Sequence, residues 1–407
     1  MKILILGGGA SGMMAALSAA SDPRNTVTVL ERQGRVGKKL MATGNGRCNL
    51  TNTSLTPENY HGADPAFVLP ALEAFGVERT LDFFHSLGLL TVTEPGGRVY
   101  PLSDQANSVV DVLRFTLEAR GVSVVCGCDV VEVRKKARGW QALAATGEAY
   151  FGDKLIVACG GCAGKKIGGT RSGYHLLSML GHSCTELLPA LTQSKTDTEY
   201  VRSLKGVRAD CSVRLKKEGQ TTAQSAGELQ FTEFGISGPV TFEISRAASV
   251  GGEGQTVILN FLRHYDPAQG VSLLLERRTA FPALPAEELL SGFVQARLGK
   301  VIVKRAGLSA DTSLSDLTDD ELRTVVSLIQ GFSLRVEGVM GMDSAQVTVG
   351  GVPTCEFDPY TLESRLAPNV YATGEVLDID GDCGGFNLQW AWSSGWLAGR
   401  LGEGGRR

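Results

Sequence analysis

Three glycines and one acid near the start of the chain have the types and spacing of a dinucleotide-binding site. Gly7, Gly9 and Gly12 follow the pattern G-x-G-x-x-G, and Glu31 comes about twenty residues later. In such a site the first glycine permits a tight turn, the second lets the backbone approach a pyrophosphate, and the third lets a helix pack close to a sheet. The acid accepts hydrogen bonds from ribose hydroxyls. It favours FAD or NAD over NADP, because it would repel the 2′-phosphate of NADP.

The segments around these residues have the patterns of the elements that must position them. Residues 2–6 are an apolar run, residues 13–20 are rich in helix formers, and residues 26–30 form a second β-type run. A helix that starts at the glycines would direct its unpaired N–H groups and its positive dipole end at phosphates. The sequence therefore predicts a Rossmann-like α/β domain. We expect no secretory signal, because the glycines interrupt the apolar region after a few residues.

The composition is that of an ordinary globular protein. The chain has 407 residues, of which 43% are hydrophobic and 20% charged, and its net charge is −3. This length predicts two or three domains, and the charge gives no electrostatic reason to expect nucleic acid. We expect no membrane partner, because no apolar run is long enough to cross a bilayer. Nine scattered cysteines without a secretory pattern indicate reduced thiols and a cytoplasmic protein.

A glycine-rich, basic loop follows Glu31. Residues 32–52 contain glycines suited to close backbone approach, and the basic residues Lys38, Lys39 and Arg47, which could neutralise phosphate or bond a ring carbonyl. The alternative is a solvated basic loop. We favour a ligand-binding loop, because loops that carry chemistry are often long and rich in glycine.

The middle of the chain predicts further elements and inserted domains. Residues 65–120 have helical spacing, and strands are expected at residues 122–126, 129–133, 140–145 and 154–158. The pattern becomes β-like from residue 190 to about 261, and helical from 267 to 331. We therefore predict four parts: a first FAD-domain segment at 1–189, a β-rich insert at 190–265, a helical insert at 266–340, and a second FAD-domain segment at 341–407.

A second informative stretch lies near the C-terminus. A β-type run ends in Gly374-Glu375, which looks like a second FAD fingerprint whose acid binds the ribityl chain. After it, Gly384 and Gly385 precede an amphipathic helix. Backbone N–H groups at such a helix start would lie where an isoalloxazine carbonyl sits, and the helix dipole would stabilise an anionic reduced flavin.

Cysteine and metal-ligand patterns are weak. Cys159 and Cys162 form a C-x-x-C, which is either a redox dithiol or two small residues at a strand-to-turn junction, and we favour the second. The five histidines lack metal-ligand spacing. Asp378, Asp380 and Asp382 lack the glycine and glutamate of a calcium loop, so we predict no metal.

Several motifs together resemble one family. They are Gly-Arg-Cys-Asn-Leu-Thr-Asn at residues 46–52, the stretch from Gly227 to Pro239, Gly-Glu-Val-Leu-Asp at 374–378, and Gly-Gly-Phe-Asn-Leu-Gln at 384–389. The chain resembles bacterial NAD(P)/FAD-dependent oxidoreductases of the aminoacetone-oxidase type, a group that includes members similar to bile-acid reductases. The resemblance covers nearly the whole chain. It implies a glutathione-reductase-like FAD domain built from both chain ends, interrupted by a β-barrel-like and a small helical domain.

The chain departs from the family pattern at three places. Asn45 replaces a usual glycine, Asp382-Cys383 replaces Tyr-Thr beside the flavin, and Cys159 replaces Thr in the turn after a strand. The change at Asp382-Cys383 could alter the substrate face, so no relative's substrate is carried over. The residues assigned to FAD are Gly7, Gly9, Ala10, Ser11, Gly12, Glu31, Arg32, Lys38, Lys39, Thr43, Gly44, Asn45, Arg47, Cys48, Asn49, Val131, Cys159, Gly160, Gly161, Gly374, Glu375, Asp382, Gly385, Phe386, Asn387 and Leu388. Catalytic residues stay unassigned.

The leading hypothesis is an FAD-dependent oxidoreductase that acts on a small organic substrate of the amine, carbonyl or enone class. We expect the inserts to cover the flavin ring and form the substrate cleft. No second complete G-x-G-x-x-G unit follows Glu31, so NAD(P)H would visit transiently, or oxygen would take the electrons. The alternatives are a flavin-binding module, an RNA-modifying flavoprotein, and an NAD-only dehydrogenase, which would be colourless.

Overall fold

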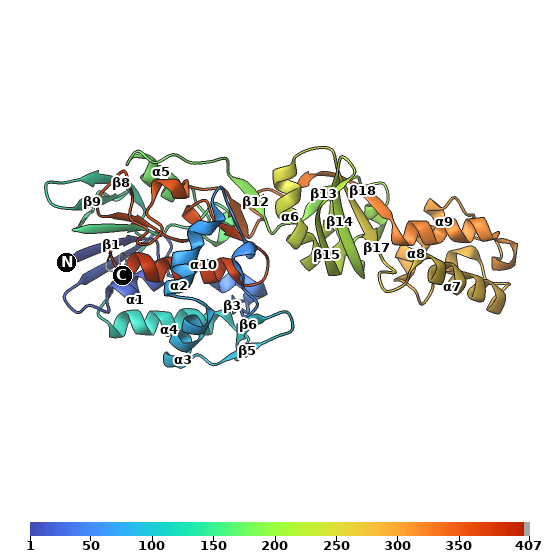
Figure 1. Cartoon of the computed structure of the whole chain (residues 1–407), viewed down its shortest axis with the longest axis horizontal. Helices are drawn as coiled ribbons and strands as arrows, with labels where there is room; N and C mark the ends of the chain where they lie inside the picture. The colour runs from blue at the N-terminus through green and yellow to red at the C-terminus, as the bar shows by residue number, and fades with distance from the viewer. Residues whose placement is uncertain (403–407) are drawn as a thin grey trace. The chain divides into compact units, whose positions relative to one another are not determined.

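The computed structural model describes residues 1–402 and divides into two compact units (Figure 1). Unit 1 comprises Met1–Leu188 and Gln346–Arg407, and unit 2 comprises Pro189–Ala345. Both ends of the chain therefore belong to unit 1. The four-part division expected from the sequence stays a prediction.

Unit 1 is built on a five-stranded parallel sheet. Its order is β20-β11-β1-β2-β7, with the bounds β20 (Val370–Ala372), β11 (Lys154–Val157), β1 (Lys2–Leu6), β2 (Thr26–Glu31) and β7 (Ser123–Cys126). The central strands are nearly continuous apolar runs with buried side chains, as parallel strands covered on both faces require. The first strand, helix and second strand predicted from the sequence are β1, α1 (Ala10–Ala19) and β2.

The two chain ends meet in a helix pair. Helix α10 (Phe386–Gly399), red in Figure 1, lies beside α1, dark blue in the same figure. Gly395 and Gly399 allow this close approach, because a Cβ at either position would overlap a backbone carbonyl oxygen of α1, that of Ser11 or of Ala15. The last segment of the chain is thus packed against the glycine-rich start.

Smaller elements surround this sheet. Helices α2 (Leu69–Ala74), α3 (Val77–Ser86) and α4 (Ala106–Ala119) occupy most of the stretch predicted to be helical, and β5 (Thr91–Thr93) and β6 (Arg98–Pro101) interrupt it. Strand β6 pairs with β3 (Thr51–Asn52). A three-stranded antiparallel sheet contains β8 (Val130–Lys135), β9 (Trp140–Ala144) and β10 (Ala149–Gly152). A two-stranded sheet joins β4 (Tyr60–His61) to β21 (Asp380–Gly381).

Unit 2 contains a closed antiparallel barrel. Its strands are β13 (Ser194–Thr196), β16 (Gly235–Ser237), β15 (Gln220–Phe231), β14 (Arg208–Lys217), β17 (Gln255–Asn260) and β18 (Phe332–Val339). Buried and partly exposed residues alternate along β17, as expected for a strand with one face in a core. Helix α6 (Pro239–Gly251) follows β16 along the chain.

Three further helices complete unit 2: α7 (Pro267–Ala280), α8 (Ala296–Arg305) and α9 (Asp319–Gln330). Their buried residues, such as Leu274, Ile302 and Ile329, belong to the same apolar core as Leu259 of the barrel. Helix α9 begins at a capping box in which Thr318 accepts from the Glu321 amide. Within the described residues, none of the helices is long and apolar enough to cross a membrane.

Candidate functional site

The glycines at the start of α1 form an open backbone cradle. Gly7 has φ +106°, and its amide donates to the Leu30 carbonyl at 2.8 Å. A Cβ on Gly12 would overlap the Gly7 carbonyl oxygen, whereas a Cβ on Gly9 would meet nothing within 4 Å. No side chain caps α1, so the amides of its first turn, including those of Ala10 and Ser11, are directed at this open space. The cradle suits an anion.

Glu31, at the end of β2, stabilises the cradle from the side. Its Oε2 accepts from the Gly8 amide at 2.6 Å, and its Oε1 accepts from the Gln33 amide at 2.7 Å. A carboxylate has about four lone-pair positions, so Glu31 can accept further hydrogen bonds from a ligand. The next residue, Arg32, donates to the Gly168 carbonyl at 3.3 Å.

The basic residues of the following loop already have protein partners. Lys39 Nζ pairs with Glu375 Oε2 at 2.7 Å, and Lys38 Nζ donates to Gln33 Oε1 at 2.9 Å. Arg47 pairs with Glu94 at 2.6 Å and also with Asp104, and its guanidinium lies over the Tyr100 ring at 4.0 Å. The hydrogen bonds that Arg47 donates to Glu94 and Asp104 raise its pKa. Two of these three basic residues, Lys39 and Arg47, are therefore paired with acids from distant segments.

Residues 43–49 of this loop adopt unusual backbone conformations. Gly44, Asn45 and Cys48 have φ between +57° and +62°, and the hydroxyl of Thr43 donates to the Leu40 carbonyl. Burial raises the pKa of the Cys48 thiol to about 12. Asn49 Oδ1 is buried and has no hydrogen-bond partner within the described part of the chain. An orphaned amide oxygen in an otherwise satisfied loop indicates a place for a ligand donor.

The start of α10 lies against this loop. Gly385 has φ +103°, and a Cβ there would come within 2.5 Å of the Thr51 carbonyl oxygen and 2.9 Å of Asn49 Oδ1. No side chain caps α10, so the first-turn amides of Phe386, Asn387 and Leu388 lack a side-chain acceptor. The Asn387 side chain instead bonds the Gly381 backbone in both directions, at 2.9 and 2.7 Å.

The second fingerprint lies beside the cradle. The Glu375 carboxylate accepts from the Thr348 amide at 2.9 Å as well as from Lys39. A Cβ on Gly161 would approach Glu375 Oε1 to 2.5 Å, and one on Gly374 would approach Ser11 Oγ to 2.6 Å. The turn after β11, the turn after β20 and the start of α1 therefore converge. The predicted residue Val131 is the unpaired residue of a β-bulge in β8.

The favoured interpretation of Cys159 and Cys162 as two structural residues stays a prediction. Cys159 Sγ donates to the Leu6 carbonyl at 3.4 Å, and burial raises its pKa to about 12. A thiol with so high a pKa is a poor nucleophile. All nine cysteines lie within the described residues, and none forms a disulfide.

One pair of residues near α10 was not singled out as a pair from the sequence. His61 Nε2 lies 2.8 Å from Asp382 Oδ1, and Asn59 Nδ2 donates to Asp382 Oδ2 at 3.1 Å. Asp382 had been noted as a departure from the family pattern. No local sequence pattern identifies His61 as a site residue, because its partner Asp382 is far away in the sequence.

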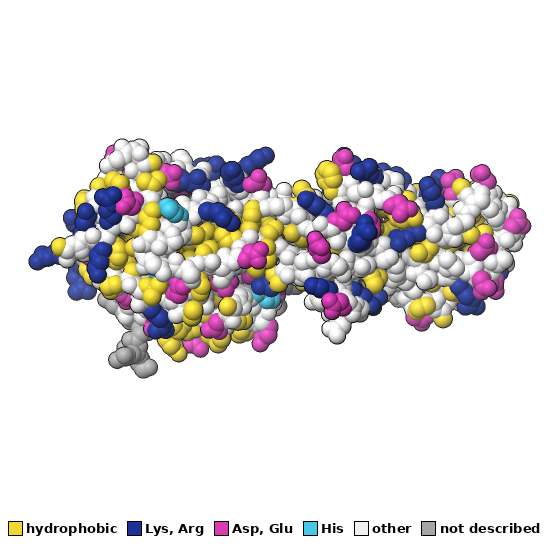
Figure 2. Space-filling view, turned by 90° about the horizontal axis from the view of Figure 1, so that it is seen from above, with side chains coloured by type: hydrophobic (Ala, Val, Ile, Leu, Met, Phe, Trp, Pro, Cys, Tyr) yellow, Lys and Arg dark blue, Asp and Glu magenta, His cyan; other side chains and the backbone are white. Residues whose placement is uncertain are grey.

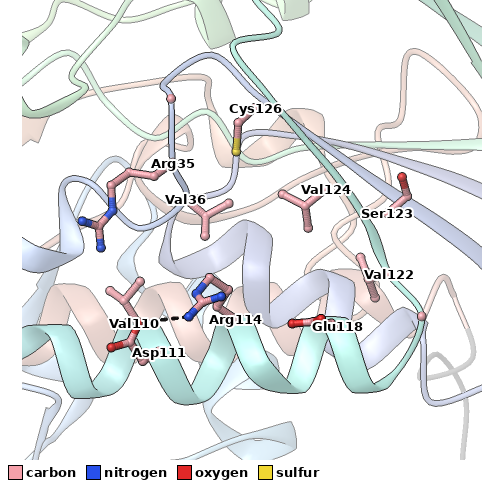
Figure 3. Close-up of a pocket in the computed structure, with 12 residues that line it drawn as sticks. Arg35, Val36, Val110, Asp111, Arg114, Glu118, Val122, Ser123, Val124 and Cys126 are labelled. Carbon is pink, nitrogen blue, oxygen red and sulfur yellow. Dashed lines mark ion pairs between the residues drawn. The ribbon is translucent and has the colours of Figure 1, made fainter.

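A separate groove of about 660 Å³ lies between α4 and the edge strand β7 (Figure 3). Its wall is mixed: it includes Val36, Val110 and Val124, and also charged residues such as Arg114, which pairs with Asp111 at 3.7 Å. None of the residues predicted to bind the cofactor lines it. The groove is thus a feature of the sheet edge and not of the cradle.

The family follows from comparison of the whole sequence. The family model described as "HI0933-like protein Rossmann domain" matches residues 1–401. This chain belongs to that family.

Two similar curated proteins match over nearly their full length. The 3-dehydro-bile acid delta(4,6)-reductase of Clostridium scindens is 40% identical over 403 residues, covering 98% of each protein. The ribosomal RNA dihydrouridine synthase of Escherichia coli is 30% identical over 396 residues, covering 97% of this chain and 96% of that protein.

Solved structures agree with the fold. The FrdA subunit of E. coli quinol fumarate reductase gives a TM-score of 0.50 at 17% identity, over 100% of this chain and 72% of that one. The 3-ketosteroid delta1-dehydrogenase of Sterolibacterium denitrificans gives a TM-score of 0.50 at 12% identity, over 98% of both chains. At these identities the likeness concerns the fold alone.

This member of the HI0933-like family is an FAD-dependent oxidoreductase. Its own geometry fits that cofactor: Gly9 is open, α1 and α10 begin without side-chain caps, and Asn49 Oδ1 lacks a partner. All residues predicted to bind FAD lie in unit 1.

Proposed function

We propose that this HI0933-like flavoprotein reduces a carbon–carbon double bond conjugated to a carbonyl group, in an apolar polycyclic substrate of the 3-oxo bile acid kind. The observation that carries the proposal is 40% identity, over 98% of both proteins, to a 3-dehydro-bile acid delta(4,6)-reductase. The second relative supports the same reaction class. Dihydrouridine forms from uridine by saturation of a double bond that is likewise conjugated to a carbonyl, so the two names differ in substrate more than in chemistry.

Within this proposal, the open cradle holds the cofactor's pyrophosphate on the amides of Gly9, Ala10 and Ser11. Glu31 accepts from the adenosine ribose, and the bulged backbone at Val131 and the Cys159–Gly160 turn border the adenine. Lys39 and Glu375 bind the ribityl chain. These assignments use groups that the chain already positions by hydrogen bonds.

The ring end of the site is formed by residues 43–49 and the start of α10. The bound cofactor supplies a hydride. The uncapped amides of α10 and its positive dipole end stabilise negative charge at the ring. Asn49 Oδ1, which has no protein partner among the described residues, accepts a hydrogen bond from the ring. The paired state of Arg47 keeps its guanidinium in place beside Tyr100.

The electrons come from a nicotinamide that binds only transiently. The sequence contains one G-x-G-x-x-G unit with its acid, and that unit is assigned to FAD. A reductase needs a donor, so we propose NADH or NADPH, with oxygen as a competing acceptor.

The charge distribution favours a small substrate over ribosomal RNA. RNA-binding proteins carry a basic patch that neutralises phosphates. In residues 189–345, Asp and Glu slightly outnumber Lys and Arg. On the face shown in Figure 2, the two signs are interspersed over unit 2. An RNA substrate stays the second candidate because of the 30% identity to the E. coli enzyme.

The test is flavin reoxidation without oxygen. The purified protein, yellow from absorbance near about 450 nm, is reduced with NADH or NADPH and then mixed with a 3-oxo-4,6-diene bile acid or with unmodified ribosomal RNA. We expect the dienone to restore the absorbance at least about tenfold faster than the RNA does. Faster reoxidation by RNA, with dihydrouridine in the product, would select the second candidate. A flavin that no dienone reoxidises would contradict the proposal.

A further inference from the structure

His61 and Asp382 form a hydrogen-bonded pair next to the start of α10. We propose that His61 is the acid that donates the proton in the reduction, and that Asp382 is a positioning residue that orients it. This inference rests on the proposed function, because only reduction of a carbon–carbon double bond requires a proton donor at this place.

Both side chains of the pair are partly exposed, but several hydrogen bonds fix their positions. Strands β4 and β21 pair His61 with Asp380 in register, and the Asp382 amide donates to the Asn59 carbonyl at 2.9 Å. The Asp382 carboxylate is occupied at both oxygens, by His61 at 2.8 Å and by Asn59 at 3.1 Å. A carboxylate fixed in this way sets the orientation of the imidazole.

The pair belongs to the loop that starts α10. The Asp382 carbonyl accepts from Asn387 Nδ2 in the first turn of that helix, at 3.2 Å. The Gly384 carbonyl accepts from Asn52 Nδ2 at 2.9 Å. The same loop approaches Asn49, whose Oδ1 lacks a partner. The imidazole is therefore anchored to the backbone that we assign to the reactive end of the cofactor.

The imidazole has one nitrogen left for a substrate. Its Nε2 faces Asp382, whereas Nδ1 has no hydrogen-bond partner among the residues that the structure describes. The His61 side chain is 31% exposed, so a ligand can reach it. Acids lie on the segments next to it: Asp380 and Asp382 on the facing segment, and Asp378, which accepts from the Ala63 amide at 3.2 Å.

Three other acids near this loop, Tyr60, Tyr100 and Cys48, are poor proton donors. Burial raises the pKa of the Tyr60 hydroxyl, which donates to the Phe386 carbonyl at 3.1 Å. Burial also raises the pKa of Tyr100, which lies under Arg47. The Cys48 thiol is fully buried. The His61 side chain, by contrast, is partly exposed and therefore within reach of a substrate.

The reaction balances with one hydride and one proton. When bound, the reduced cofactor would supply the hydride to the carbon remote from the carbonyl and would itself be oxidised by two electrons. The protonated His61 supplies the proton to the carbon next to the carbonyl, so the double bond becomes a single bond with two new C–H bonds. The imidazole becomes neutral and regains its proton from solvent, and NAD(P)H restores the cofactor.

The first experiment measures reoxidation of the reduced holoenzyme by a 3-oxo-4,6-diene bile acid over a range of pH. We expect His61→Gln to slow this step by about 100-fold and to change its pH profile, because a positioned general acid contributes about 10²–10⁴-fold. Asp382→Asn should slow it less and change the pH profile. His264→Gln is the matched control, because His264 also lies near an aspartate, Asp210 at 3.8 Å, but in unit 2.

The second experiment does not depend on turnover. Diethyl pyrocarbonate modifies accessible imidazoles, and mass spectrometry gives the rate at each histidine in the apoprotein, with FAD, and with FAD plus a saturated 3-oxo bile acid. We expect FAD plus the steroid to protect His61 at least about fivefold and to leave His264 unprotected. FAD content and melting temperature of the His61→Gln variant should match the wild type, since a merely structural histidine would change them.

The outcomes separate this inference from the function. A wild type that reduces no dienone overturns both. A wild type that does so, with a His61→Gln variant of equal rate and pH profile, overturns the inference alone. So does His61 labelling that FAD and the steroid leave unchanged.

Discussion

Gly9 and Gly12 belong to one motif, but the space around them differs. A Cβ at Gly9 enters open space, whereas a Cβ at Gly12 overlaps the Gly7 carbonyl oxygen. We expect Gly9→Ala to leave the melting temperature of the apoprotein unchanged and to weaken FAD binding by at least about tenfold, because the methyl group occupies the space for the phosphates. Gly12→Ala should destabilise the apoprotein itself by about 1–3 kcal/mol.

Thermal unfolding of the two apoproteins and FAD titration by fluorescence provide the measurements. Equal melting temperatures of the two variants would show that Gly12 is not needed for packing. If Gly9→Ala bound FAD with undiminished affinity, the assignment of the pyrophosphate to the cradle would be contradicted.

Glu31 is expected to act twice. It accepts from the Gly8 amide, which shapes the cradle, and it is assigned to the adenosine ribose. Glu31→Arg should therefore raise the dissociation constant for FAD by about tenfold or more, since a lost charged hydrogen bond costs about 1.5–3 kcal/mol. Glu31→Gln keeps an acceptor for Gly8 and should lose less. The flavin-to-protein absorbance ratio after gel filtration measures both, and full flavin content in Glu31→Arg would contradict the assignment.

At the residue scale, the sequence predicted motifs better than partners. The types and spacing of Gly7, Gly9, Gly12 and Glu31 predicted a cradle that the structure contains. The sequence could not show that Lys39 pairs with Glu375, or His61 with Asp382, because these partners are separated by hundreds of residues. Pairing at such separations is determined by the fold and leaves no local pattern.

At the element scale, periodicity was informative where an element has one clear environment. The apolar runs of β1 and β2 were evident from the sequence. Strand β18 was not, because it follows α9 directly and lies in a stretch that we predicted to be helical. It closes the barrel with β13 and β17, which are remote in sequence. Strand pairing of this kind depends on tertiary contacts more than on propensity.

A buried histidine ties two distant segments of unit 1 together. His182 Nδ1 lies 2.6 Å from Glu356 Oε2, its Nε2 lies 2.8 Å from Ser364 Oγ, and its ring stacks on Phe357 at 4.6 Å. This arrangement has the order of a catalytic triad. Ser364 Oγ, however, already accepts from the Leu366 and Ala367 amides and is buried, so the cluster is structural.

This cluster should make stability depend on pH. Burial by itself raises the pKa of the Glu356 carboxyl, but hydrogen bonds from Ser183 and His182 outweigh it and lower the pKa below the ordinary 4.5. A carboxyl whose pKa is lower in the folded state stabilises the fold above its unfolded pKa, and this contribution is lost as the pH falls through the folded pKa.

We therefore expect the free energy of unfolding to fall as the pH drops below about 4.5, and Glu356→Gln to show a smaller decrease over that range. Urea unfolding at several pH values measures both slopes. Glu253 in unit 2 is exposed and provides the control substitution, Glu253→Gln. Identical slopes in Glu356→Gln and wild type would mean that Glu356 does not contribute.

At the scale of the whole molecule, the two units differ in how the chain builds them. Unit 1 needs both ends: β20 pairs with β11, and α10 packs on α1 through Gly395 and Gly399. Unit 2 is one continuous segment with a closed barrel and its own apolar core. A continuous segment of chain with its own hydrophobic core has the properties of a domain that can fold alone.

Residues 189–345 expressed alone should therefore unfold cooperatively and be colourless, because the predicted FAD residues lie in unit 1. Residues 1–188 alone should retain no flavin, since they lack β20, Glu375 and α10, although they contain the complete G-x-G-x-x-G motif. Circular dichroism melting and flavin absorbance after purification measure these outcomes. Flavin bound by residues 1–188 at wild-type affinity would mean that the first motif suffices, and that the C-terminal segment does not contribute to the cofactor site.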